Sequence, residues 1–84
     1  MTDELEAKRV RWHSRRGMLE LDVLLLPFAE QVYTTLSADE QAVYRRLLEC
    51  EDPDLFAWFI EHQTPPDAEL EAMVNRILER ARNR

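Results

Sequence analysis

A single glycine, Gly17, stands in this chain of 84 residues. Average usage of about 7% would place roughly six glycines in a chain of this length. β-Hairpins and barrels need glycine at many tight turns, and no stretch of the sequence sustains the alternation of apolar and polar residues that is typical of a strand. The scarcity of glycine therefore indicates an all-α protein.

Apolar residues recur at helical spacing along most of the chain. Five segments show this spacing: about residues 3–15, 18–33, 37–50, 52–60 and a last one that follows 64–67 and reaches 81. The short connections between them predict that neighbouring helices are antiparallel. We expect a compact five-helix antiparallel bundle that forms a single domain over residues 1–84.

The first two segments differ in how much of their surface is apolar. In the first segment Leu5 and Trp12 stand seven residues apart, with Val10 nearby, and predict its buried side. The second segment is apolar nearly all round, which predicts the central and most buried helix. Its apolar residues are Met18, Leu19, Leu21, Val23, Leu25, Leu26, Phe28 and Val32.

Helix-start signals precede the last three segments. Ser37 followed by Glu40 three residues later predicts a capping box. Asp52 followed by Pro53 predicts an N-cap and a first helical residue. The run 64–67 predicts a further start with proline at the first helical position.

The net charge of −6 is unevenly distributed. Residues 1–20 carry five basic and four acidic side chains (+1), residues 21–72 carry two and twelve (−10), and residues 73–84 carry four and one (+3). The strongly acidic middle of the chain would repel the phosphate backbone of a nucleic acid. We therefore expect no binding to nucleic acid.

The chain shows no sign of a membrane or secreted protein. The longest apolar run, residues 23–29, is seven residues long, whereas a bilayer requires about 20. The acidic start is unlike a signal peptide, and the single cysteine, Cys50, excludes an internal disulfide. We expect a cytoplasmic protein.

Few residues are candidates for chemistry. The only histidines, His13 and His62, stand in no grouping with zinc-site spacing, and Cys50 falls on an apolar stripe, as expected of an inert buried thiol. The sequence has no glycine-rich phosphate loop. We therefore expect no catalytic residue, no metal site and no cofactor held stably by the chain itself.

One cluster surrounds the glycine: Trp12, Arg15, Arg16, Gly17, Glu20 and Asp22. It has a structural interpretation, with Gly17 at positive φ after the first helix, the arginines in that helix's last turn and the acids in the first turn of the next. It also has a functional one. A residue without Cβ lets another backbone approach closely, and arginine and tryptophan dominate binding hot spots.

This cluster resembles the signature of a known family. Trp12-x-x-Arg15-Arg16-Gly17-Met18-x-Glu20-x-Asp22 is similar to the signature of the succinate dehydrogenase assembly factors, the bacterial flavinator proteins, whose hallmark is an RGxxE motif. Arg16, Gly17 and Glu20 match that motif. The similarity covers essentially the full chain, and continues in Pro27-Phe28, in residues 46–50 and in Asp52-Pro53-Asp54-Leu55-Phe56-x-Trp58.

The resemblance implies a small helical protein that binds the flavoprotein subunit of succinate dehydrogenase, and often that of fumarate reductase. Such a factor promotes covalent attachment of FAD to a histidine of that subunit, which carries the FAD. The family's RGxxE surface makes the contact, so Arg16, Gly17 and Glu20 inherit that role, with Trp12, Arg15 and Asp22 beside them. We expect a monomer that acts by binding and not by catalysis.

Two other functions are compatible with the residues. An antitoxin-like regulator would neutralise a basic partner with its acidic middle, and would depend on Asp39, Glu49, Glu51 and Asp54. A small enzyme using Glu20 or Cys50 would have to turn over a substrate as an isolated chain.

Overall fold

The computed structural model describes residues 2–83, which form five α-helices and one short 3₁₀ helix, with no strand among them. The helices are α1 (Thr2–Ser14), α2 (Leu19–Gln31), α3 (Ala38–Leu48), α4 (Asp52–Phe59) and α5 (Ala68–Arg82), and the 3₁₀ helix η1 (Tyr33–Thr35) follows α2. The predicted all-α fold is confirmed.

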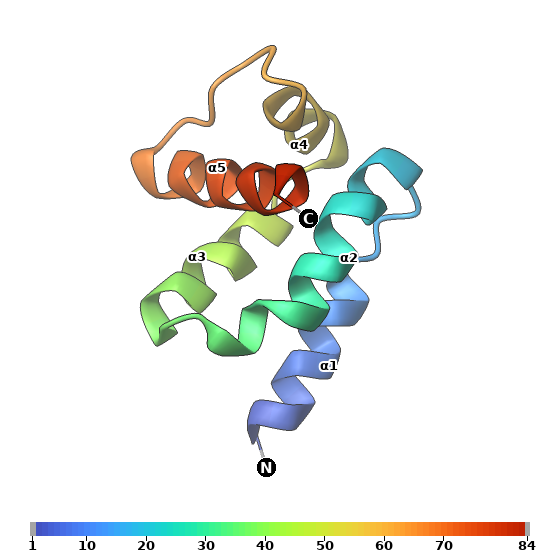
Figure 1. Ribbon diagram of the computed structural model, residues 1–84, viewed down its shortest axis with the longest axis vertical. Helices are drawn as coiled ribbons and strands as arrows, with labels where there is room; N and C mark the ends of the chain where they lie inside the picture. The colour runs from blue at the N-terminus through green and yellow to red at the C-terminus, as the bar shows by residue number, and fades with distance from the viewer. Residues whose placement is uncertain (1, 84) are drawn as a thin grey trace.

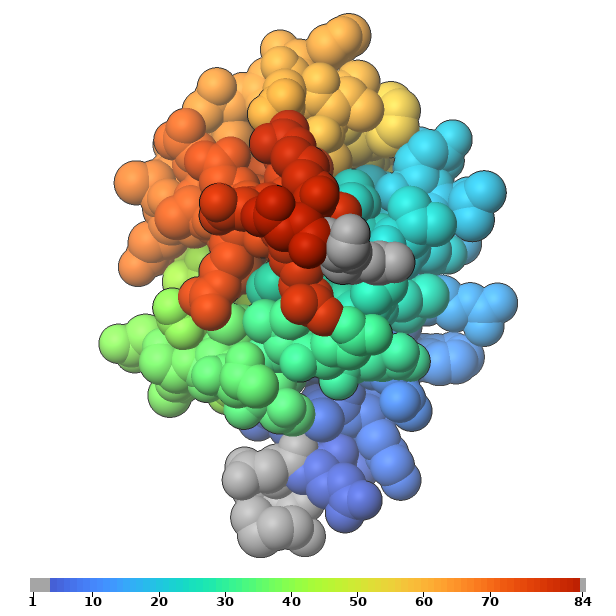
Figure 2. Space-filling view, viewed as in Figure 1, coloured from blue at the N-terminus to red at the C-terminus, as the bar shows by residue number. Residues whose placement is uncertain are grey.

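α1 and α2 lie side by side and run in opposite directions, while α3, α4 and α5 gather on the other side of α2 (Figure 1). The radius of gyration is 12.0 Å, close to the roughly 12 Å of a folded chain of this length. In the space-filling view α5 covers the middle of one face, and blue side chains of α1 project beyond the rest of the molecule (Figure 2). No helix among residues 2–83 is long and apolar enough to cross a membrane.

One hydrophobic core joins all five helices. α5 contributes its i, i+3, i+4, i+7 stripe, and the aromatic rings of Phe28, Tyr33 and Tyr44 pack together at its centre. The fully buried large side chains are Leu21, Leu25, Phe28, Tyr33, Tyr44, Leu47, Leu48, Leu55 and Ile77.

α2 is central, as predicted, because it contacts α1, η1, α4 and α5, but one side of it is open to solvent. Leu21, Leu25 and Phe28 face the core, but Leu19 is 73% exposed and Val23 is 54% exposed. α1, α4 and α5 pack against α2 and leave the side that carries Leu19 and Val23 uncovered. A chain of this size buries only about 60–65% of its unfolded surface and has no element left for the open side.

The predicted buried side of α1 is confirmed for Val10 and wrong for Leu5 and Trp12. Val10 and Ser14 are buried, whereas Leu5 and Trp12 are exposed. Residues two apart on a helix differ by roughly 200°, so a helix that buries Val10 turns Trp12 outward. α1 therefore packs through a narrow stripe and presents its large aromatic side chain to solvent.

The helix starts are confirmed in one case and displaced in two. Ser37 and Glu40 form the predicted capping box. α4 begins one residue earlier than predicted, with Glu51 as N-cap, which leaves the Asp52 side chain free for a distant partner. Before α5 the N-cap is Asp67, which accepts a hydrogen bond from the Leu70 N–H at 2.8 Å, and proline is not the first helical residue.

Candidate functional site

Arg16 and Gly17 of the RGxxE motif lie in the turn between α1 and α2, and Glu20 lies in the first turn of α2. α1 ends at Ser14 and α2 begins at Leu19. Gly17 has a φ of +79°, as its predicted position after α1 requires. A Cβ built on Gly17 would meet nothing within 4 Å, so the space beside this glycine is open.

The Arg16 side chain points into the protein and is 11% exposed. Its Nε donates a hydrogen bond to Asp52 Oδ1 at 2.8 Å. Asp52 lies in the first turn of α4, so the two side chains also form an ion pair between the α1–α2 turn and that helix. The Nη atoms of Arg16 donate to three backbone carbonyl oxygens, those of His13 (3.1 Å), Leu48 (2.8 Å) and Cys50 (2.9 Å). The guanidinium therefore uses four of its five N–H groups inside the fold.

These carbonyl groups belong to helix ends. His13 lies in the last turn of α1, and Leu48 and Cys50 lie at and just beyond the end of α3. Terminal carbonyl groups of a helix lack intrahelical donors and carry partial negative charge, so a cation placed there is favourable. The backbone N–H of Arg16 also donates to Asp22 Oδ1 at 2.8 Å, which ties the turn to α2. Arg16 thus connects four helices.

The remaining motif residues face outward. Gly17 and Glu20 are exposed, and the Glu20 carboxylate has no hydrogen-bond or ion-pair partner among the described residues. Trp12 is 75% exposed and Arg15 is exposed beside it. The structure therefore separates the predicted site residues: Arg16 and Asp22 bond within the fold, while Trp12, Arg15, Gly17 and Glu20 are available to another molecule.

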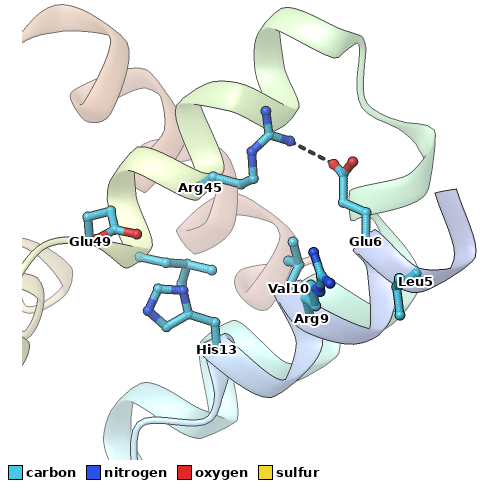
Figure 3. Close-up of a pocket in the computed structure, with 8 residues that line it drawn as sticks. Leu5, Glu6, Arg9, Val10, His13, Arg45 and Glu49 are labelled. Atoms are coloured by element: carbon cyan, nitrogen blue, oxygen red, sulfur yellow. Dashed lines mark hydrogen bonds and ion pairs between the residues drawn. The ribbon is translucent and has the colours of Figure 1, made fainter. Parts of the chain in front are cut away.

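One hollow adjoins this turn and a second lies further along α1. A smaller one of about 350 Å³ is lined by Trp12, His13, Arg15, Arg16 and Asp52. A larger one of about 510 Å³ lies between α1 and α3, with His13 and Glu49 among its lining residues and Arg45 paired with Glu6 at its other end (Figure 3). Charged side chains line both hollows, so the surface around the motif is uneven and polar.

The other candidates for chemistry stay apart. We expected a buried thiol at Cys50, but this residue is only half-buried. Desolvation, its largest influence, raises the pKa of its thiol, which disfavours the reactive thiolate. Among residues 2–83 no group of three or more His, Cys, Asp or Glu side chains could hold a metal ion.

A family model described as "Flavinator of succinate dehydrogenase" matches residues 8–81. The chain belongs to this flavinator family. The match confirms the resemblance drawn from the RGxxE motif.

Curated relatives agree with the family assignment. The chain is 60% identical over 80 residues to "FAD assembly factor SdhE" of Pseudomonas aeruginosa PAO1, covering 95% of each chain. It is 58% identical over 73 residues to the protein of the same name in Shewanella oneidensis MR-1, covering 87% of this chain and 89% of that one. The fold resembles the solution structure of a protein named UPF0350, with a TM-score of 0.76, 44% identity, and coverage of 94% of this chain and 85% of that chain.

Sequence reasoning missed two features of this flavinator-family site. It did not find Asp52 as the partner of Arg16, because 36 residues separate them and no local pattern reports a contact across that distance. It also assigned Leu19 and Val23 to the core. The length of the chain could have indicated that some of these apolar residues are exposed, since a short chain cannot cover an apolar helix on every side.

Proposed function

We propose that this chain binds, in the cytoplasm and as a monomer, the flavoprotein subunit of succinate dehydrogenase and promotes covalent attachment of FAD to a histidine of that subunit. The description of its family and the name of its relatives support this proposal. The flavoprotein of fumarate reductase is a second partner under the same proposal. FAD remains with the partner, and this chain acts as an assembly factor without turnover of its own.

The division of the RGxxE motif carries the proposal at the level of residues. Arg16 holds the turn in place from inside, and Gly17 and Glu20 present its outer side to the partner. The open space beside Gly17 allows a partner segment to approach the backbone closely. We therefore assign contact to Gly17 and Glu20 and positioning to Arg16.

Binding can promote the attachment without a catalytic group on this chain. A binder favours the conformation for which it has the higher affinity, and shifts the population accordingly. If that conformation holds the partner's histidine against the flavin, positioning alone lowers the barrier by several kcal/mol. An exposed, unpaired carboxylate such as Glu20 suits this role, because it accepts hydrogen bonds from the partner or takes up a proton at the contact.

The test replaces residues on the outer half of the motif. Glu20→Gln removes the charge and keeps the shape, and Gly17→Asn adds a side chain in the open space with a residue that tolerates positive φ. We expect each variant to reduce covalent flavin on the flavoprotein subunit at least about 10-fold. A change of this size corresponds to the loss of one charged hydrogen bond or of one close backbone contact. Covalent flavin is measured by in-gel fluorescence of the denatured subunit, in a strain that lacks the native chain.

Glu71→Gln is the matched control, because Glu71 is exposed in the first turn of α5 as Glu20 is in the first turn of α2. It should leave flavin attachment and the melting temperature unchanged. Equal flavin attachment by the Glu20→Gln and Glu71→Gln variants would contradict the assignment. Flavin attachment that does not need this chain, together with salt-dependent binding of a basic partner that is lost in variants of Glu51 or Asp54, would favour the acidic antitoxin-like regulator instead.

A further inference from the structure

A trough between α1 and α2 lies on the opposite side of α1 from the hollow in Figure 3. Its volume is about 370 Å³. It is lined by three residues of α1, by Arg15 just after that helix and by two residues of α2: Lys8, Arg11, Trp12, Arg15, Leu26 and Glu30.

The trough has an apolar component that nothing in the described chain covers. Trp12 is 75% exposed, although a tryptophan side chain is among the largest apolar surfaces a protein can bury. On α2 the exposed Leu19 and Val23 precede Leu26 by seven and three residues, which places them on the same side of the helix. Exposed tryptophan next to arginine is the composition of a binding hot spot.

The charge of the trough is opposite to that of the molecule. Lys8, Arg11 and Arg15 against Glu30 give +2, whereas the whole chain carries −6. Arg11 Nη1 lies 3.9 Å from Glu30 Oε2, so these two charges form an ion pair. Lys8 and Arg15 have no ion-pair partner among the described residues. Two cations are therefore available to an acidic partner.

The position of the acids argues for a discrete segment and against an extended anionic surface. Glu30 lines the trough beside Arg11, and the exposed Glu20 lies on the same helix. A membrane or a nucleic-acid backbone would bring its phosphates against these carboxylates, whereas a short peptide segment can meet the cations alone.

The trough is also continuous with the proposed contact. Trp12 and Arg15 line it on one side and line the hollow beside Arg16 and Asp52 on the other. A partner that reaches Gly17 and Glu20 therefore lies next to it.

We infer that the α1–α2 trough is a second contact with the flavoprotein subunit, and that it takes a segment of that subunit in which acidic side chains flank an apolar anchor. The inference rests on the proposed function. The anchor packs against Trp12 and Leu26, and the acidic side chains pair with Lys8 and Arg15.

The first measurement uses the two tryptophans of the chain as reporters. Trp12 is exposed and Trp58 is 8% exposed, so 5-fluorotryptophan labelling should give two separate ¹⁹F resonances. The Trp12→Ala variant assigns them. Addition of the unlabelled flavoprotein subunit with non-covalent FAD should shift or broaden the Trp12 resonance and leave that of Trp58 nearly unchanged.

The second measurement is the affinity for the same subunit by calorimetry at 50 and 300 mM salt. We expect Trp12→Ala to raise Kd about 30-fold, as a hot-spot residue does. Arg15→Glu should raise it roughly 10-fold and reduce its salt dependence. Arg82→Glu, which makes the same charge change at an exposed site on α5, should alter Kd less than about twofold, as a charge outside an interface does.

The outcomes separate the inference from the proposed function. If the native chain binds the subunit and Trp12→Ala and Arg15→Glu bind equally well, the trough is not a contact and the inference is overturned while the function stands. If no form binds, both are overturned. A Trp12 response to phosphatidylglycerol vesicles or to rising concentration of the chain itself, without one to the subunit, assigns the trough to lipid or to a second copy and overturns the inference.

Discussion

Arg16 shows how much of this fold depends on one side chain. Its guanidinium satisfies carbonyl groups at the ends of α1 and α3 and pairs with Asp52 in α4. A planar fork of donors can meet several acceptors at once, whereas an ammonium group is a point charge on a flexible stem. The positive charge of Arg16 is thus used within the bundle.

Arg16→Lys should therefore destabilise the protein although it conserves charge. We expect the free energy of unfolding to fall by about 1–2 kcal/mol, because lysine cannot replace all four hydrogen bonds. Urea denaturation followed by circular dichroism measures the loss. Arg15→Lys, one residue away and exposed, should change stability by less than about 0.5 kcal/mol; an equal effect of the two substitutions would refute the role of Arg16.

At the scale of single elements, the end of α4 is the clearest site of strain. Glu61 follows the helix with a φ of +64°, the one positive φ of a non-glycine residue among the described residues. Its N–H donates to Trp58 O at 3.1 Å and that of His62 donates to Ala57 O at 2.9 Å. This pair of bonds is the Schellman motif, which usually has glycine at the position of Glu61.

Replacement of this residue by glycine should stabilise the protein. We expect Glu61→Gly to raise the free energy of unfolding by about 0.5–1 kcal/mol, since glycine adopts positive φ without steric cost. Glu61→Ala is the control, because both variants lose the exposed pair with Arg82 and only glycine relieves the backbone. Urea melts in which the alanine variant is as stable as the glycine variant would show that no strain is stored there.

At the scale of the whole molecule, Tyr44 joins three helices at the centre of the core. Its hydroxyl lies 2.8 Å from Ser14 Oγ and 3.4 Å from Leu25 O. Ser14 Oγ also donates to Val10 O at 2.7 Å, and the single proton of the Tyr44 hydroxyl is shared between two acceptors within reach, Ser14 Oγ and Leu25 O. The small polar cluster is satisfied within the core and fixes α1 against α2 and α3.

This arrangement predicts an alkaline limit to stability. Burial raises the pKa of Tyr44 from 10.0 to about 12. Between those values the folded protein keeps a proton that the unfolded chain has released, so the free energy of unfolding should fall as pH rises from 10 to 12, by about 2–3 kcal/mol. Urea melts at pH 8, 10 and 11.5 test this. Tyr44→Phe should show a shallower decline, and an identical decline would contradict it.

The local features of the chain were readable from its residues. The helical periods, the Ser37–Glu40 capping box and the positive φ of Gly17 depend on neighbours within one turn, where propensity and hydrogen bonding act directly. The RGxxE motif and the length of the match predicted the family of the chain, and the comparisons confirmed this prediction.

The distribution of the motif between inside and outside was not readable, because it depends on contacts between distant parts of the chain. The sequence by itself determined that five helices form and where a cation and an acid flank a glycine. Only the tertiary structure decided that Arg16 turns toward the ends of α1, α3 and α4, while Trp12, Leu19 and Glu20 stay outside. The physical reason is that 84 residues cannot bury every apolar face, and packing selects which faces remain for a partner.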